Sequence, residues 1–276
     1  MPTFFDGELV FVHIPKCAGI SVRSALANYQ LSEGLGDPSW YRAHESLFEI
    51  QTNFVEKWGT EKWESTTIVS TFRHPVDRAV SWWKFRKKIN MMNFQESSTL
   101  KPEEEQVFNV TSAAHPYIVP EDYAKYHRKV CSCRHENDEA HVEEFDSLSF
   151  HDYIGRMTIW KESGCENPNC PYHMLPPQVR WLNDTSGNMR MDRLNLFLVD
   201  RLNELEDFLP DMPKIYHRNV SRKDKEDYRE HLTTESLMLL NQLYGEDFKI
   251  YEALNRNSSR PAPIRFPMNH TERKKQ

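Results

Sequence analysis

Lys16 and Gly19 stand in a short turn between two patterned segments, and this spacing favours the binding of a phosphate. Residues 9–12 (LVFV) form an apolar run suited to a buried strand, and the periodicity from Ile20 onward predicts a helix. Backbone N–H groups at such a turn can face an anion, the helix dipole favours negative charge there, and the lysine adds a cation. The nucleotide-hydrolase pattern G-x-x-x-x-G-K-[ST] is absent, because here the lysine precedes the glycine.

Arg73 occupies a comparable position further along the chain. Residues 66–72 (TTIVSTF) are β-branched and apolar, which predicts a second buried strand, and Pro75 begins a segment with helical spacing. Arg73 therefore lies between a strand and a helix. Its planar guanidinium can bind phosphate oxygens through two hydrogen bonds, so we expect it to contact a second phosphate.

These two stretches resemble motifs of one enzyme family. Residues 13–21, HIPKCAGIS, resemble the 5′-phosphosulfate loop of the sulfotransferases, in the Golgi carbohydrate branch that includes heparan sulfate 2-O and uronyl 2-O enzymes and usually reads H-I-P-K-T-G/A-G-T-S. Residues 73–81, RHPVDRAVS, resemble that family's 3′-phosphate motif. The resemblance implies 3′-phosphoadenosine 5′-phosphosulfate (PAPS) as the cofactor, with PAP as its product. The cofactor-binding residues that it implies are Lys16, Cys17, Ala18, Gly19, Ile20, Ser21, Arg73, Ser81, Arg222 and Lys223.

Two positions of the first motif depart from the family pattern. Cys17 and Ile20 stand where the family usually has threonine. Ile20 removes a hydroxyl that would otherwise reach the phosphate, so backbone N–H groups and Ser21 are expected to supply more of the contact.

The resemblance also implies catalytic roles. Lys16 would stabilise charge on the leaving phosphate, and His44, shortly after the first predicted helix, stands where the family places its base. Glu45 is a weaker candidate for the same base. We expect no catalytic metal, because a sulfuryl group carries less charge than a phosphoryl group and no carboxylate cluster accompanies the loop.

The implied fold is α/β: a single domain with a central parallel sheet flanked by helices, P-loop-like, with the cofactor at the carboxyl ends of the strands. Residues 1–260 would form the catalytic domain, residues 91–145 a variable insertion on the acceptor side, and residues 261–276 a disordered tail. A further strand is expected at 194–199, with helices at 150–157, 201–209 and 237–254. Two further stretches resemble weaker family elements, residues 176–182 (PPQVRWL) near the acceptor cleft and residues 244–251 (YGEDFKIY) in the final helices.

Four cysteines cluster in the second half of the chain, and two interpretations stay open. With His127, His135 and His173 nearby they could hold a structural zinc, or they could form disulfides in an oxidising lumen, with a pairing that sequence does not reveal. The N-x-[ST] sequons of the chain indicate glycosylation in such a lumen, so they favour disulfides over zinc. The disulfide candidates are Cys131, Cys133, Cys165 and Cys170, and the glycosylation candidates are Asn109, Asn183, Asn257 and Asn269. A fifth sequon, at Asn219, would stay unused if its loop covers the cofactor.

The composition of the chain limits the classes of ligand that it is expected to bind. The 276 residues carry a formal net charge of −6 and are 38% hydrophobic, which suits a sizeable core and argues against nucleic acid or another strongly charged polyanion as ligand. A neutral or lightly charged glycan is the expected acceptor. No apolar run approaches the roughly 20 residues of a membrane span. The five sequons, the four clustered cysteines and the family resemblance lead us to expect a Golgi-lumen enzyme held by an anchor outside this sequence, with a secreted or cytoplasmic protein as the alternative.

Two other functions remain open on the same motifs. One is a non-catalytic relative that binds PAP or a glycan, although Lys16, His44 and Arg73 are all present. The other is a sulfotransferase that acts on the hydroxyl of a small molecule.

Overall fold

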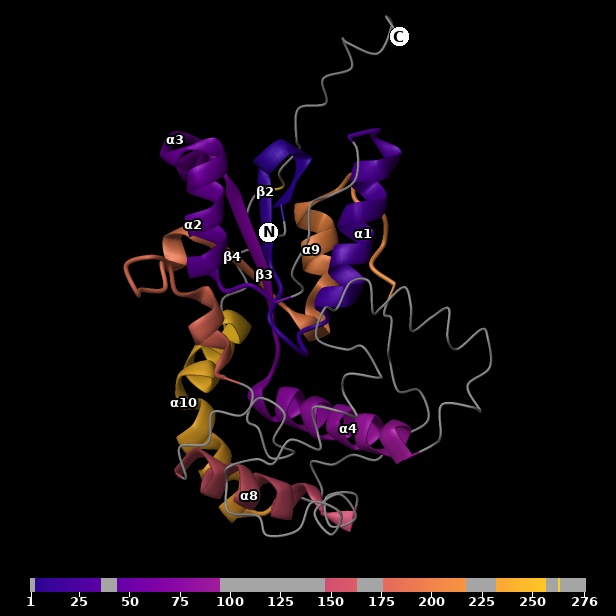
Figure 1. The fold of residues 1–276 in the computed structure, drawn as a ribbon, viewed down its shortest axis with the longest axis vertical. Helices are drawn as coiled ribbons and strands as arrows, with labels where there is room; N and C mark the ends of the chain where they lie inside the picture. The colour runs from indigo at the N-terminus through magenta and orange to yellow at the C-terminus, as the bar shows by residue number, and fades with distance from the viewer. Residues whose placement is uncertain are drawn as a thin grey trace, which may run out of the picture. The chain divides into compact units, whose positions relative to one another are not determined.

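The computed structural model describes residues 3–35, 44–94, 147–162, 176–216 and 232–256, together with residue 263 (Figure 1). The chain divides into two compact units. The first comprises residues 1–72, 181–220 and 253–276, and the second comprises residues 73–180 and 221–252. Each unit has its own cluster of buried apolar side chains.

The first unit contains a four-stranded sheet in the order β1-β2-β3-β4. The strands are β1 (Thr3–Phe4), β2 (Leu9–Val12), β3 (Thr67–Phe72) and β4 (Leu194–Leu198). The last three are parallel, which confirms an α/β fold with strands at the three apolar runs. β1 was not predicted, and it pairs antiparallel with β2. Because β2 and β3 are parallel and in register, their carboxyl ends lie at the same edge of the sheet.

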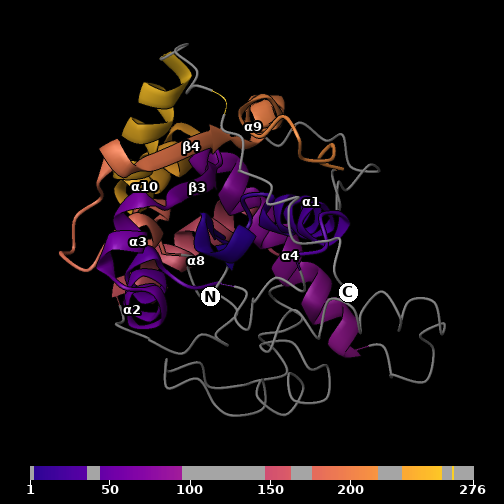
Figure 2. The same cartoon turned by 90° about the horizontal axis from the view of Figure 1, so that it is seen from above.

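Helices cover both faces of this sheet (Figures 1 and 2). On one side lie α1 (Gly19–Ser32) and α9 (Leu202–Phe208), and on the other lie α2 (Leu47–Trp58) and α3 (Thr60–Ser65). The side chains packed between the sheet and the first pair include Leu9, Phe11, Val22, Leu26, Val69, Phe197, Leu205 and Phe208. All four residues of β2 are buried, as expected for a parallel strand covered on both faces.

Three helices pack together in the described residues of the second unit. These are α4 (Pro75–Phe94), α8 (Phe150–Glu162) and most of α10 (Thr234–Arg256). Their shared core includes Val76, Val80, Tyr153, Ile154, Met157, Leu240 and Tyr244. Ser149 caps the start of α8, since its hydroxyl accepts from the Asp152 N–H at 3.2 Å. α4 continues to Phe94, four residues into the segment 91–145 that was expected to be an insertion.

Short 3-10 turns connect these elements: η1 (Phe5–Gly7), η3 (Gln178–Leu182), η4 (Met191–Arg193) and η5 (Val199–Arg201). None of the helices in the described part of the chain has the length and apolar composition needed to cross a bilayer. Several predicted features lie outside the described residues: Arg222, Lys223, the cysteines at 131, 133, 165 and 170, the sequons at Asn109, Asn219, Asn257 and Asn269, residues 95–145, and the tail apart from residue 263.

Candidate active site

The turn after β2 leads into a helix that has no side-chain cap. Lys16 (φ 67°) and Ala18 (φ 59°) both adopt the left-handed conformation, and Ala18 is the N-cap residue of α1. No side chain caps the helix there, and the Ser21 N–H donates to the Ala18 carbonyl at 3.0 Å. A helix start without a side-chain cap, preceded by left-handed turn residues, suits an anion, because the helix dipole favours negative charge there.

His13 explains why residue 19 is glycine. An ideal Cβ at residue 19 would lie 1.7 Å from Cδ2 and 2.1 Å from Nε2 of the His13 imidazole. The ring therefore lies directly against the backbone at the start of α1. It is 2% exposed and stacks with Phe11, with ring centroids 6.2 Å apart. Any side chain at residue 19 would have to displace this buried ring.

Arg23 lies against the other side of the His13 imidazole. Its Nη1 is 3.4 Å from Nδ1 of His13. Because a guanidinium can only donate, Nδ1 of His13 is the acceptor in this contact. Burial lowers the pKa of Arg23 to about 10, which still leaves it charged at neutral pH. A buried positive charge therefore stands one helical turn after the start of α1.

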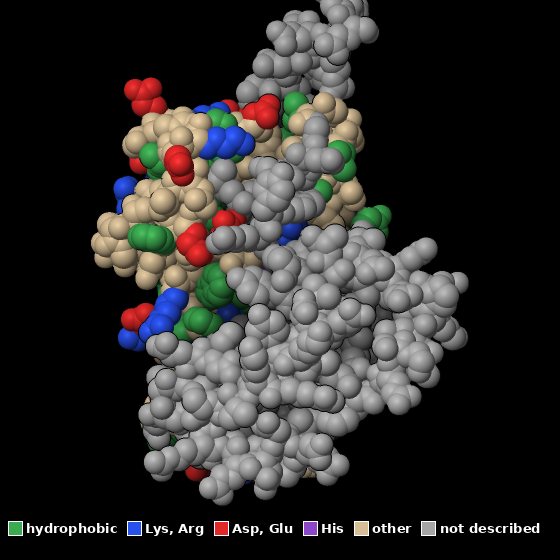
Figure 3. All heavy atoms as spheres, in the orientation of Figure 1, with side chains coloured by type: hydrophobic (Ala, Val, Ile, Leu, Met, Phe, Trp, Pro, Cys, Tyr) green, Lys and Arg blue, Asp and Glu red, His purple; other side chains and the backbone are tan. Residues whose placement is uncertain are grey.

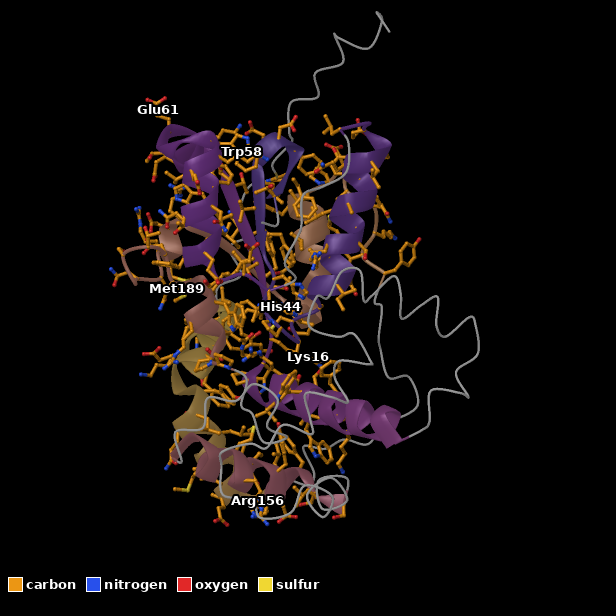
Figure 4. All side chains as sticks on the ribbon, in the orientation of Figure 1. Lys16, His44, Trp58, Glu61, Arg156 and Met189 are labelled. Atoms are coloured by element: carbon orange, nitrogen blue, oxygen red, sulfur yellow. The ribbon has the colours of Figure 1, made fainter. Side chains whose placement is uncertain are left out.

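His44 joins the loop from the segment that precedes α2. Its Nδ1 lies 3.1 Å from the carbonyl oxygen of His13, and the two imidazole centroids are 4.3 Å apart. A carbonyl can only accept, so Nδ1 of His44 donates, and the neutral ring then carries its lone pair on Nε2. Figure 4 shows His44 and Lys16 at the same end of the sheet. This tautomer leaves Nε2 as the atom that could take a proton from an acceptor hydroxyl.

Glu45, the alternative base, is more deeply buried than its neighbour. It is 4% exposed, and its Oε1 accepts from Nδ2 of Asn53 on α2 at 3.4 Å. The adjacent Ser46 begins α2 with a capping box, in which its hydroxyl accepts from the Glu49 N–H and Glu49 accepts from the Ser46 N–H. Glu45 therefore lies in the packed connection to α2, which favours His44 as the base.

Cys17 and Ser21 are both buried, and the cysteine holds the turn in shape. The Cys17 N–H donates to the Ile14 carbonyl at 3.3 Å, its thiol lies 3.7 Å from the Pro15 carbonyl, and its own carbonyl accepts from the Thr71 hydroxyl. These contacts tie the loop to β3. The half-buried residues in this stretch are Lys16, Ala18 and Ile20.

The second motif, residues 73–81, lies in the second unit. Arg73 and Ser81 are both half-buried, Arg73 immediately before α4 and Ser81 within it. The backbone of Arg73 is held on both sides by one side chain. The Arg73 N–H donates to Oε1 of Gln178 at 2.9 Å, and Nε2 of Gln178 donates to the Arg73 carbonyl at 2.9 Å.

Sequence reasoning assigned no role to His13, Arg23, Gln178 or Asp247, which the structure places around the predicted site residues. A signal was present for Arg23, because it stands four residues, about one helical turn, after Gly19 in the predicted helix. No comparable signal linked Gln178 to Asp247, which are 69 residues apart.

Comparison with family models, with characterised proteins and with solved structures found no match to this chain. Within the described ranges, no three His, Cys, Asp or Glu side chains are grouped so that they could hold a metal ion.

Proposed function

We propose that this protein is a PAPS-dependent sulfotransferase, which transfers a sulfuryl group to a hydroxyl of a carbohydrate acceptor. The observation that carries the proposal is the 3.1 Å contact between Nδ1 of His44 and the His13 carbonyl, which leaves Nε2 of His44 as the proton acceptor beside an anion-type loop. A base oriented next to a phosphate-type loop is what transfer to a hydroxyl requires. The fit of the loop to a phosphate-bearing ligand is supported by left-handed Ala18 and by the absence of a side-chain cap on α1.

In this proposal each residue has a separate task. PAPS, when bound, supplies the sulfuryl group. Lys16 and the first N–H groups of α1 hold the 5′-phosphate side and stabilise the charge that develops there. His44 orients the acceptor hydroxyl and takes its proton at Nε2. Arg73 holds the 3′-phosphate through its guanidinium, with Ser81 as an additional donor.

Arg73→Ala is expected to weaken PAP binding by roughly 1.5–3 kcal/mol, because a hydrogen bond to a charged group is lost. Isothermal titration calorimetry with PAP measures the loss directly. Arg156→Ala is a suitable control, because Arg156 is an exposed arginine of α8 in the same unit. Equal PAP affinity in the wild type and in Arg73→Ala would refute the assignment of the 3′-phosphate site.

We further propose a glycan acceptor and a lumenal compartment. The described sequon, at Asn183, is half-buried and is followed by the exposed Thr185, whose N–H donates to Oε1 of Gln51 at 3.0 Å. Over α2 and α3, the visible face carries acidic and basic side chains side by side (Figure 3). This mixed surface and the net charge of −6 suit a neutral or lightly charged glycan better than a heavily sulfated one.

The cysteines provide a test of the compartment. If Cys131, Cys133, Cys165 and Cys170 form two disulfides, the denatured, non-reduced chain should be lighter by about four hydrogens than the reduced chain. Cys17, which is a free thiol in the structure, should then be the residue that an alkylating reagent labels after unfolding. Intact-mass spectrometry decides this, and four additional reactive thiols with bound zinc would instead support a metal site.

A further inference from the structure

We infer that Gln178 and Asp247 are positioning residues for Arg73, and that they set the selectivity for a ligand with a 3′-phosphate. The inference rests on the proposed function, because it concerns the site that Arg73 would form. All of the contacts that carry it lie within the second unit.

Gln178 holds Arg73 in the way that a neighbouring strand would. Its side-chain amide accepts from the Arg73 N–H and donates to the Arg73 carbonyl, each at 2.9 Å. Two such bonds to a single residue fix the position of its peptide groups and hence the direction in which its side chain leaves the backbone. The Gln178 side chain is fully buried, so water does not compete for these bonds.

Asp247 in turn fixes Gln178. One carboxylate oxygen accepts from the Gln178 N–H at 2.8 Å and from Nε2 of Gln178 at 3.3 Å, and the other accepts from the Val179 N–H at 3.1 Å. Accepting from Nε2 fixes the orientation of the amide, because the nitrogen must face the carboxylate and Oε1 must face the Arg73 N–H. Asp247 therefore determines which way round the Gln178 amide is placed.

Arg78 completes the support for this network. It is 1% exposed, its Nη1 donates to the Pro176 carbonyl at 2.9 Å, and its positive charge favours the ionised form of Asp247. Burial nevertheless raises the pKa of Asp247, so keeping this carboxylate in the interior costs free energy. An apolar group of the same size would avoid that cost. The network places these groups around the backbone of one arginine, which assigns them to positioning that residue.

The test compares binding of PAP with binding of adenosine 5′-monophosphate, which lacks the 3′-phosphate. Gln178→Met keeps most of the side-chain volume and removes both bonds to Arg73. PAP affinity should fall roughly 10- to 100-fold, the range expected when a charged hydrogen bond is weakened, while affinity for adenosine 5′-monophosphate stays within about twofold. Adding Arg73→Ala to Gln178→Met should cause little further loss, because both changes act on one contact.

Gln30→Met is the matched control. Gln30 is also a buried glutamine that holds backbone, since its Oε1 accepts from the Phe5 N–H at 3.0 Å, but it belongs to the first unit. It should lower thermal stability without changing the ratio of the two affinities. Hydrogen exchange at the Arg73 amide is a second measurement, which should speed up in Gln178→Met and not in Gln30→Met.

The outcomes separate this inference from the proposed function. A wild-type chain with no preference for PAP would overturn the proposed function and the inference with it. A wild-type preference that Gln178→Met retains would overturn the inference alone, as would equal losses for both ligands. If Gln178→Met does not fold, Asp247→Asn, which keeps the size of the side chain but replaces one of its acceptor oxygens by a donor, is judged by the same affinity ratio.

Discussion

His44→Ala should lose turnover by roughly 10²–10⁴-fold while it binds PAP as tightly as the wild type, the range expected when a general base is removed. The reason is the geometry of the imidazole. Nδ1 is engaged by the His13 carbonyl, which leaves Nε2 as the proton acceptor, and neither atom is assigned to the cofactor. Transfer of labelled sulfate to a panel of glycans measures turnover, and calorimetry measures PAP binding.

Two further variants distinguish loss of the base from loss of cofactor binding and test the alternative base. Lys16→Ala should lose both PAP affinity and turnover, because its charge serves the ground state and the transition state. Glu45→Gln should stay active, since Glu45 is buried against α2 and accepts from Asn53. A nearly active His44→Ala together with a dead Glu45→Gln would transfer the role of base to Glu45 and leave the cofactor site unchanged.

Gly19→Ala should lower turnover by at least about 100-fold and weaken PAP binding as well. The added Cβ would lie 1.7 Å from the His13 ring, so the ring or the start of α1 must move. Movement of His13 also displaces the carbonyl that orients His44, and a misplacement of about 1 Å can cost two orders of magnitude in rate. We expect a stability loss of about 1–3 kcal/mol from the overpacked site, measured by denaturant unfolding.

Gly155→Ala is the matched control, because it makes the same substitution where there is space. Gly155 lies inside α8, and a Cβ there would meet no atom within 4 Å. Alanine should stabilise this helix by about 0.5–1 kcal/mol and leave PAP binding unchanged. If Gly19→Ala were as well tolerated as Gly155→Ala, the close packing of His13 on the loop would contribute nothing to turnover or to PAP binding.

Local patterns predicted the elements whose signal is contained in a few residues. The apolar runs at residues 9–12 and 66–72 became β2 and β3, and the helix expected at residues 150–157 is α8. α2 was not predicted, although the capping box at Ser46 and Glu49 was a usable signal. β1 has only two residues, which is too short for any periodicity to be read.

The site was harder to predict than the fold, because its contacts join residues that are far apart in the sequence. The position of His44 suggested a base, but its tautomer follows from a hydrogen bond to a residue 31 positions earlier. The bonds from Gln178 to Arg73 span 105 residues. Such contacts depend on how the elements pack, and neither periodicity nor spacing encodes them.

The short β1 strand has a consequence for association between chains. A strand with open N–H and C=O groups along one side is a template on which another molecule can add a strand, and repeated addition leads to aggregation. β1 pairs with β2 through Thr3 opposite Val10 and Phe4 opposite Leu9, so the chain occupies that position beside β2 with its own residues. Left-handed Phe5 and Asp6 then turn the backbone away after only two paired residues. β2, which leads into the turn that holds Lys16, is thereby shielded from intermolecular β-pairing on this side, and β1 itself is too short to nucleate it.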